Sequence, residues 1–410
     1  MIRPFVFCIG MCLLPRVLLA GEVIYEEQFI FDPAGDPHGH VHASAIVECP
    51  NGDLRAVWYE NGTPLPSPRY FNAQQDKSSD VRIGSSRRAK GATTWGAPFV
   101  ISDTFGTSDN NPTMVIDAQD RLWLVHSTMI AAPEWTWGSS MLRYWVSSDY
   151  AGQDMPRWDE ANVLLPHPLG FEQLIDALGQ RLKTEGPPNG VSSERAQQFV
   201  VHLRKQLDDP AKLRLGWMPR AHPLIRSDGA LILPLSNENF DIAMMAITSD
   251  GGRTWQYSEP VPDVGVTQPT LVELADGRID AYFRNDDPAH RIKRGTSHDG
   301  GLTWSKLELT ELPHPGAGIE VIRLANGHLA LVYNNVEDSP RDKLAISLSD
   351  DEGRTWKWTR QLEDEPGGRF DYPSLIQAED GSLHVTYSYH LRTIKHVRLS
   401  ESWVQQSDGL

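Results

Sequence analysis

Polar side chains recur at both ends of short hydrophobic runs in this chain, and their types could bind or cleave a sugar. Each of six runs ends at a tight turn, and nine or ten residues before the turn stands one set: His42, Asn111, Arg220 to His222, Gln268, Gly318 and Tyr372. A second set follows the runs after the turns: Glu60, Ser127, Asn237 with Glu238, Arg284, Asn334 with Asn335, and Tyr389 with His390. Hydrogen-bonding groups together with guanidinium groups suit an oligosaccharide or an acidic sugar. The alternative is a merely solvated rim of a channel.

The turns between these runs predict the fold that would gather such residues. They are Asn51-Gly52, the degenerate Gln119-Asp120, Asp228-Gly229, Asp276-Gly277, Asn326-Gly327 and Asp380-Gly381. Asn-Gly and Asp-Gly are strong hairpin signals because both residues tolerate positive φ. From Gly229 onward the turns recur every 48 to 54 residues, a period typical of four-stranded blades. The sequence therefore predicts an all-β fold, a six-bladed β-propeller with one strand start per blade near a common axis.

A second repeat marks the opposite end of three blades. Its pattern, Ser/Thr-x-Asp-x-Gly-x-Thr-Trp, runs from Thr248 to Trp255, from Ser297 to Trp304 and from Ser349 to Trp356. We expect the Asp to accept backbone N–H bonds, the Gly to adopt a left-handed conformation and the Trp to pack between blades. Because a residue repeated in every blade serves the scaffold, these Asp residues are predicted to be structural.

One segment interrupts the repeat. Apolar residues at helical spacing occur twice between the second and third hairpins, around Phe171 to Leu182 and around Phe199 to Leu207. This predicts a two-helix insertion at about 167–212. It could cover the edge of the disc or form a lid or wall over a ligand site.

Composition limits the class of protein. The chain has 410 residues and a net charge of −16, and an acidic chain without a basic stripe argues against nucleic-acid binding. Residues 1–20 resemble a secretory signal, with Arg3 before an apolar stretch too short to span a membrane. We therefore expect export to the periplasm or the medium, with residues 21–410 as one propeller domain. Cys49 would then be the one remaining thiol, so neither a disulfide nor a Cys-based metal site is expected.

The Ser/Thr-x-Asp-x-Gly-x-Thr-Trp motifs resemble the Asp boxes of sialidases (neuraminidases) and their bacterial neuraminidase-repeat relatives, which are six-bladed propellers. The segments around His42, Gln268-Pro269 and Phe370 to Leu375 look like the predicted-neuraminidase subgroup. The resemblance implies a Tyr nucleophile activated by a Glu, an Asp acid/base and three Arg that clamp the substrate carboxylate. It also implies no cofactor.

Position by position, the resemblance implies a role for several residues. Tyr372 stands at the place of the nucleophile, and Arg284 and Arg341 match two of the clamping arginines. Asp80 is the best match for the acid/base, with Asp76 as a rival. Arg220, His222 and Asn111 are further candidate substrate-binding residues from the first set.

Two positions depart from the family pattern. His42 stands at the place of the first arginine, and Gln268 replaces the glutamate that should polarise Tyr372. A tyrosine hydroxyl ordinarily ionises near pH 10, and an amide cannot remove its proton. Glu238 could supply the missing carboxylate, although it could equally be a solvated loop charge. His38, His40 and His42 alternate as strand residues do, but no Asp, Glu or Cys stands beside them at ligand spacing, so no metal site is predicted.

These observations lead to one expectation and two alternatives. We expect a secreted sialidase-like glycoside hydrolase, of exo-alpha-sialidase type, acting on terminal acidic sugars. One alternative is a uronate-polysaccharide hydrolase or lyase that uses His42, His222 and Tyr372, since elimination needs a cation on the carboxylate and a base at C5. The other is a carbohydrate-binding propeller without turnover. The sequence leaves the oligomeric state open.

Overall fold

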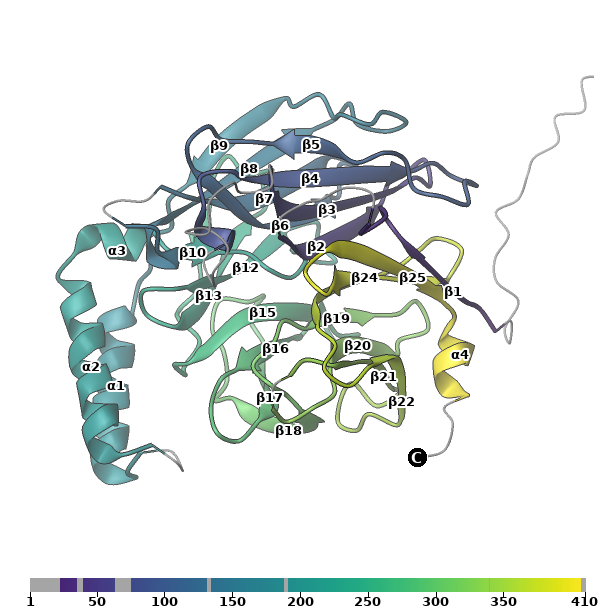
Figure 1. Ribbon diagram of the computed structural model, residues 1–410. Coiled ribbons are helices and arrows are strands. Elements are labelled where there is room, and N and C mark those ends of the chain that lie inside the picture. The colour runs from purple at the N-terminus through teal and green to yellow at the C-terminus, as the bar shows by residue number, and fades with distance from the viewer. Residues whose placement is uncertain are drawn as a thin grey trace, which may run out of the picture.

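The computed structural model describes residues 23–34, 40–62, 75–130, 134–187, 191–338 and 340–406. Its strands form six sheets, and the sheets follow one another along the chain (Figure 1). This confirms the predicted all-β six-bladed propeller. The signal segment predicted at residues 1–20 lies outside the described residues. In the described part of the chain no helix is long and apolar enough to cross a membrane.

Each of the first three sheets is a run of consecutive antiparallel strands. The first sheet contains β2 (Val41–Glu48), β3 (Leu54–Asn61), β4 (Val81–Arg88) and β5 (Phe99–Ser102). The second contains β6 (Ser108–Ile116), β7 (Leu122–Met129), β8 (Ser140–Ser147) and β9 (Glu160–Leu164). The third contains β10 (Trp217–Met218), β11 (Leu224–Ile225), β12 (Leu231–Asn237), β13 (Ile242–Thr248) and β14 (Gln256–Tyr257).

The other three sheets complete the ring. The fourth contains β15 (Val266–Glu273), β16 (Ile279–Asn285), β17 (Arg291–Ser297) and β18 (Glu308–Pro313). The fifth contains β19 (Glu320–Arg323), β20 (Leu329–Asn334), β21 (Lys343–Ser349) and β22 (Trp358–Asp364). The sixth contains β23 (Phe370–Gln377), β24 (Leu383–Tyr389), β25 (Thr393–Leu399) and the N-terminal β1 (Tyr25–Phe29). Because β1 pairs with β25, strands from both ends of the described chain share one blade and close the ring.

The three Asp boxes have the predicted geometry. In the second box, Asp299 accepts hydrogen bonds from the Thr303 backbone N–H (3.0 Å) and hydroxyl (2.6 Å). Gly301 has a φ of 94°. Trp255, from the first box, lies edge-on to Trp123 of the neighbouring blade, with ring centroids 6.3 Å apart. The boxes therefore fasten hairpins and fill the space between blades.

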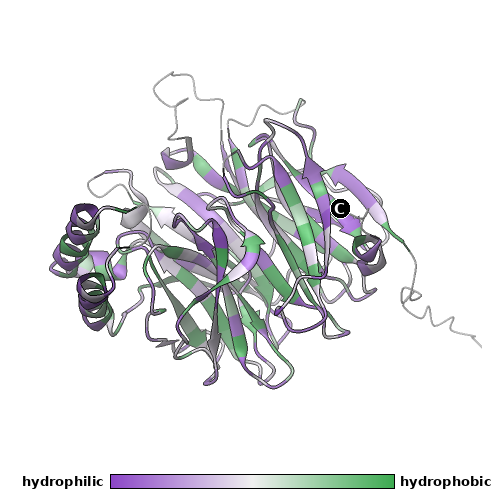
Figure 2. Ribbon diagram, turned by 90° about the horizontal axis from the view of Figure 1, so that it is seen from below, coloured by the Kyte–Doolittle hydropathy of each residue, from purple (hydrophilic) through white to green (hydrophobic). Residues whose placement is uncertain are grey.

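The insertion consists of α1 (Phe171–Thr184) and α2 (Ser193–Leu207), followed by the short α3 (Pro210–Arg214). Figure 1 shows α1 and α2 as a hairpin standing beside the sheets. Figure 2 shows hydrophobic residues concentrated in the blades, while the two helices carry both kinds. The apolar stripe of the hairpin packs on the core, because Phe171, Ile175 and Leu203 share a buried cluster with the second and third blades.

The innermost strands share an irregularity that aims side chains at the axis. Pairing with the second strand shifts between His42 and Ala45, Asn110 and Thr113, Thr267 and Thr270, and Asp371 and Ser374. Inside each of these four bulges one residue has a φ near +50°: Ala43, Asn111, Gln268 and Tyr372. A bulge bends its strand and redirects the side chain of the extra residue. Three of the sequence-predicted site residues therefore occupy one equivalent position in three blades.

Candidate active site

Tyr372 is the centre of the site. Its bulge in β23 carries the half-buried ring between the guanidinium of Arg220, 4.8 Å from the ring centroid, and the imidazole of His42, with centroids 4.4 Å apart. The phenol oxygen is 3.2 Å from Gln268 Nε2 and 3.3 Å from Arg284 Nη1. Five residues predicted by counting strands, from four blades, thus meet around one tyrosine side chain. Both nitrogens donate, so the phenol oxygen is an acceptor here.

Arg220 lies against the face of the tyrosine ring. Its side chain is 2 % exposed, and it donates from Nη2 to the Pro373 carbonyl (2.7 Å) and from Nη1 to the Ser44 carbonyl (3.3 Å). The pKa of Arg220 is lowered because the effect of burial exceeds the opposite effects of Glu320 and Tyr372. These bonds link three blades at Tyr372.

Asp371, next to Tyr372 in the chain, binds two arginines. Arg341 donates from Nη1 to Asp371 Oδ1 at 2.5 Å, and Arg369 donates from Nε to Oδ2 at 2.6 Å. Although burial by itself would raise the pKa of this carboxyl, the charges of Arg341 and Arg369 contribute to holding it at about 2. Arg341, a predicted substrate clamp, is thereby paired with a buried carboxylate and also donates to the Gly316 carbonyl. Sequence reasoning missed Asp371 and Arg369, although Asp371 stands within the Phe370 to Leu375 segment quoted above.

His42 is a neutral partner of the tyrosine. It is 5 % exposed, and burial holds the pKa of His42 well below its ordinary value against the opposite pull of Asp371. Its Nδ1 lies 3.1 Å from Ser388 Oγ. His40 stacks beside it, with ring centroids 5.4 Å apart. Within the described ranges no group of three His, Cys, Asp or Glu side chains is arranged to hold a metal ion.

Arg284 connects the tyrosine to an acidic group of side chains. It is the residue before the last in β16, and its Nη2 lies 3.4 Å from Asp286 Oδ2. Burial by itself would lower the pKa of Arg284, but Tyr372, Asp286 and Glu238 together raise it. Burial, together with the charge of Asp241, raises the pKa of Glu238 to about 7. Glu238 therefore belongs to the electrostatic surroundings of the site, on the connection after β12.

His222 forms hydrogen bonds with other blades through both ring nitrogens. Its Nδ1 is 2.8 Å from Glu320 Oε1, and its Nε2 is 2.7 Å from the Ile46 carbonyl. Glu320 in turn accepts from the Leu375 backbone N–H at 3.1 Å. Both ring nitrogens of His222 are thus occupied within the protein. Sequence reasoning missed Glu320, because no repeat or motif marks it.

The remaining candidates lie around this centre. Asn111 is buried at the position in β6 that Tyr372 holds in β23. Asp80 accepts hydrogen bonds from Ser78 and, at 3.2 Å, from Asn61 Nδ2. Asp76 interacts electrostatically with Arg369, and also with Tyr59, whose ring packs on His42. Burial raises the pKa of Asp76. The segment after residue 75 therefore offers two carboxyl groups, of which Asp76 interacts with residues of the tyrosine centre.

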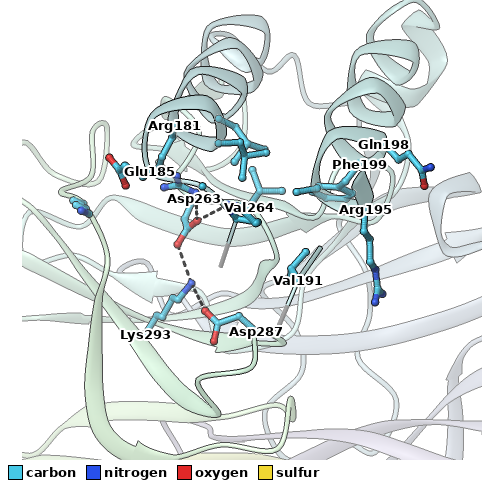
Figure 3. Close-up of a pocket in the computed structure, with 16 residues that line it drawn as sticks. Arg181, Glu185, Val191, Arg195, Gln198, Phe199, Asp263, Val264, Asp287 and Lys293 are labelled. Atoms are coloured by element: carbon cyan, nitrogen blue, oxygen red, sulfur yellow. Dashed lines mark hydrogen bonds and ion pairs between the residues drawn. The ribbon is translucent and has the colours of Figure 1, made fainter. Parts of the chain in front are cut away.

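A cavity of about 750 Å³ lies between the helical hairpin and the fourth blade (Figure 3). On the polar side of this cavity, Lys293 Nζ lies 3.0 Å from Asp263 Oδ2 and 2.7 Å from Asp287 Oδ2. Asp263 also accepts from Arg181 of α1 at 3.3 Å. Asp287 follows Asp286, the partner of Arg284, so the connection between β16 and β17 borders both the cavity and the tyrosine centre.

Fold and site together define an Asp-box propeller whose centre is a tyrosine surrounded by arginines. Residues 189–385 match the family described as BNR repeat-like domain. The chain is 28% identical over 387 residues to a sialidase of Micromonospora viridifaciens, covering 90% of this chain and 52% of that protein. It is 21% identical over 337 residues to a sialidase of Bacteroides fragilis, covering 77% and 56%. The chain thus spans about half the length of these curated relatives.

Among solved structures, the fold is similar to that of a Hadza microbial sialidase, Hz136. The TM-score is 0.67 at 15% sequence identity, covering 92% of this chain and 69% of that one. The family match and the curated relatives support assignment of the chain to the sialidase (neuraminidase) superfamily.

Proposed function

We propose that this protein is a sialidase-like glycoside hydrolase that removes a terminal sugar bearing a carboxylate. The observation that carries the proposal is the Tyr372 hydroxyl, which lies within hydrogen-bond distance of Gln268 and Arg284 on a ring held between Arg220 and His42. A tyrosine oxygen next to an arginine suits attack on a sugar whose carboxylate the arginine binds. Arg284 is the arginine best placed for that contact, because its Nη1 lies 3.3 Å from the Tyr372 hydroxyl. Arg341 and Arg369 are instead paired with Asp371.

The chemistry takes two steps in this proposal. The Tyr372 hydroxyl gives its proton to water and its oxygen forms a bond to the anomeric carbon while the glycosidic bond breaks. Asp80 or its neighbour Asp76 gives a proton to the departing oxygen. Water then attacks the same carbon, the bond to tyrosine breaks, and the carboxyl group recovers its proton from that water. Residues 21–410 would act as one propeller domain, with the insertion at 167–212 as a wall beside the site. Export by way of residues 1–20 is part of the proposal and rests on their sequence.

Release of 4-methylumbelliferone from its sialoside tests the proposal, with Tyr372→Phe as the decisive variant. We expect turnover that collapses in Tyr372→Phe and persists in Tyr144→Phe. The latter removes a hydroxyl that donates to the Gly252 carbonyl, at a distance from the site. A folded wild-type protein without turnover on sialosides or uronosides would contradict hydrolysis. If ligand affinity also survived in Tyr372→Phe, the protein would be a binding propeller.

A second candidate is cleavage of a uronate-containing polysaccharide. It is favoured by the contact between Tyr372 and a neutral His42, which could accept the proton at C5 while Arg284 binds the carboxylate. His222, which the sequence suggested for this chemistry, has both ring nitrogens engaged. Elimination gives an unsaturated product that absorbs in the ultraviolet, whereas hydrolysis does not.

A further inference from the structure

We propose that Arg220 is a positioning residue that stabilises the ionised form of Tyr372, and that it thereby replaces the carboxylate base lost at position 268. The inference rests on the proposed function, because it explains how a tyrosine without a glutamate partner becomes a nucleophile. It differs from the role that the sequence suggested for Arg220, which was contact with the substrate.

Burial separates Arg220 from any substrate. With 2 % of its surface exposed, the guanidinium has little area to offer a ligand. Its two Nη atoms are bonded to the carbonyls of Ser44 and Pro373. The Pro373 carbonyl follows Tyr372 directly, so Arg220 grips the bulge that gives Tyr372 its φ of 50°.

The cation faces the ring itself. The centre of the guanidinium is 4.8 Å from the Tyr372 centroid, within the range of a cation–π interaction. Gly318 leaves room for this contact, since a Cβ there would lie 2.8 Å from Tyr372 Cε1 and 3.2 Å from Arg220 Nε. Arginine, ring and glycine are therefore packed as one unit.

The groups around the phenol favour negative charge on its oxygen. Gln268 Nε2 and Arg284 Nη1 both donate to it, and in the described part of the chain no carboxylate is hydrogen-bonded to it. The nearby acids already have partners: Asp371 binds Arg341 and Arg369, and Glu320 binds His222. On the other side of the ring His42 is neutral, and behind it burial keeps Tyr59 protonated by raising its pKa. Two cations and one amide donor thus face the phenol.

This arrangement supplies a nucleophile without a base at position 268. The phenol proton passes to water, and the negative charge that forms on the oxygen lies between the donors Gln268 and Arg284, with Arg220 against the ring. A neutral amide serves this purpose better than a carboxylate, which would repel the charge. Gln268 in place of Glu and the buried Arg220 then serve the same purpose, which is to stabilise negative charge on the Tyr372 oxygen.

Ultraviolet difference titration measures tyrosinate directly and needs no substrate. The chain has 11 tyrosines, so the spectrum of Tyr372→Phe is subtracted to leave the signal of Tyr372. We expect Arg220→Met to move this signal to higher pH and to lower kcat by about 10- to 30-fold, the size of a buried cation–π contact. KM should stay within about twofold, because a positioning residue does not bind substrate. Arg220→Lys, which keeps a positive charge, should partly restore both the wild-type tyrosinate signal and kcat.

Arg55→Met is the matched control for loss of a buried arginine. Arg55, in the first blade, is also fully buried and donates to backbone carbonyls of the second blade, those of Tyr150, Gln153 and Asp154. It should lower stability without moving the tyrosinate signal. Gln268→Glu, which is nearly isosteric, should also move the tyrosinate signal to higher pH. It provides the test if Arg220→Met does not fold.

An unchanged tyrosinate signal in both Arg220→Met and Gln268→Glu would overturn the inference. A large increase in KM with kcat intact in Arg220→Met would also overturn it and return Arg220 to substrate binding. Absence of turnover in the wild-type protein would instead contradict the proposed function, while the spectroscopic result would still decide the inference.

Discussion

His222 and Glu320 form an ion pair, with Nδ1 2.8 Å from Oε1 and side chains that are 15% and 2% exposed. The pair comes from the third and fifth blades, and its outer hydrogen bonds reach Ile46 in the first blade and Leu375 in the sixth. Burial alone would lower the pKa of His222, but Glu320 raises it. Burial alone would raise the pKa of Glu320, but His222 lowers it. One ionic contact therefore ties four blades together.

This pair should make the stability of the protein depend on pH. The contribution of Glu320 is present above its unfolded pKa of about 4.3 and is lost as the pH falls through its lowered folded value. The contribution of His222 is present below its unfolded pKa of about 6.5 and is lost as the pH rises through its raised folded value. Glu320→Gln should cost on the order of 3 kcal/mol between these limits, and less at higher pH. Urea unfolding at a series of pH values measures this.

The half-buried pair of His328 and Glu401 offers the comparison, since its side chains are 26% and 21% exposed. Glu401→Gln should cost under about 1 kcal/mol, because solvent screens an exposed pair. If Glu320→Gln and Glu401→Gln lowered the free energy of unfolding equally, the His222–Glu320 pair would contribute no more than an ordinary surface pair.

Gly318 should be intolerant of even one methyl group. A Cβ at this position would overlap the Tyr372 ring, which cannot retreat because Arg220 and His42 hold it. We expect Gly318→Ala to lower kcat by on the order of 100-fold, since displacement of a reacting group by about 1 Å has that effect. Gly179→Ala in α1 is the control, because its Cβ would meet ordinary van der Waals contacts. It should keep full activity, and normal activity of Gly318→Ala would mean that the ring can move.

Asp76 and Asp80 can be separated by the leaving group of the substrate. We expect Asp76→Asn to lower kcat/KM by about 100-fold or more on an alkyl glycoside, whose departing oxygen needs a proton. The loss should be smaller on the 4-methylumbelliferyl substrate, which leaves readily. Burial raises the pKa of Asp76 and so keeps it protonated to higher pH, whereas the carboxylate of Asp80 is bound by Ser78 and Asn61. A selective loss in Asp80→Asn instead would assign the acid to Asp80.

The ionised carboxylate of Glu238 should destabilise the folded protein. Its folded pKa of about 7 exceeds the unfolded value of about 4.3, so folding favours the protonated carboxyl and loses stability as the pH rises between these values. Glu238→Gln should therefore stabilise the protein at pH 8, by on the order of 1–3 kcal/mol, and leave it unchanged at pH 4. Thermal unfolding at both pH values tests this, with the exposed Glu172→Gln of α1 as a neutral control. Equal stability at pH 8 would contradict the raised pKa.

The Asp boxes should affect stability and leave catalysis intact. Asp299→Ala removes acceptors for the backbone of Leu302 and Thr303 and for the Thr303 hydroxyl, which should cost about 1–2 kcal/mol. Activity per folded molecule should match the wild type at a temperature below unfolding. Loss of activity without loss of stability would instead give Asp299 a functional role.

The sequence by itself determined the architecture and several of the residues that meet at Tyr372. Hairpin turns such as Asp276-Gly277 and the Asp boxes are local signals, because a turn depends on residues that are adjacent in the chain. Counting strands from those turns predicted that His42, Gln268, Arg284 and Tyr372 meet, and the structure brings these four together. Helical spacing likewise predicted α1 and α2.

Only the tertiary structure decided what the gathered residues do to one another. Arg220 and His222 were chosen as exposed binding groups, yet one packs against Tyr372 and the other pairs with Glu320. Arg341 was expected to face a ligand, and it is bound to Asp371. These contacts join residues from different blades, far apart in the chain, and their energies depend on burial and on the direction given by a bulge. No local pattern of residues encodes the burial of a side chain or the direction in which it points. The surroundings of Tyr372 are therefore apparent only once all six blades are assembled.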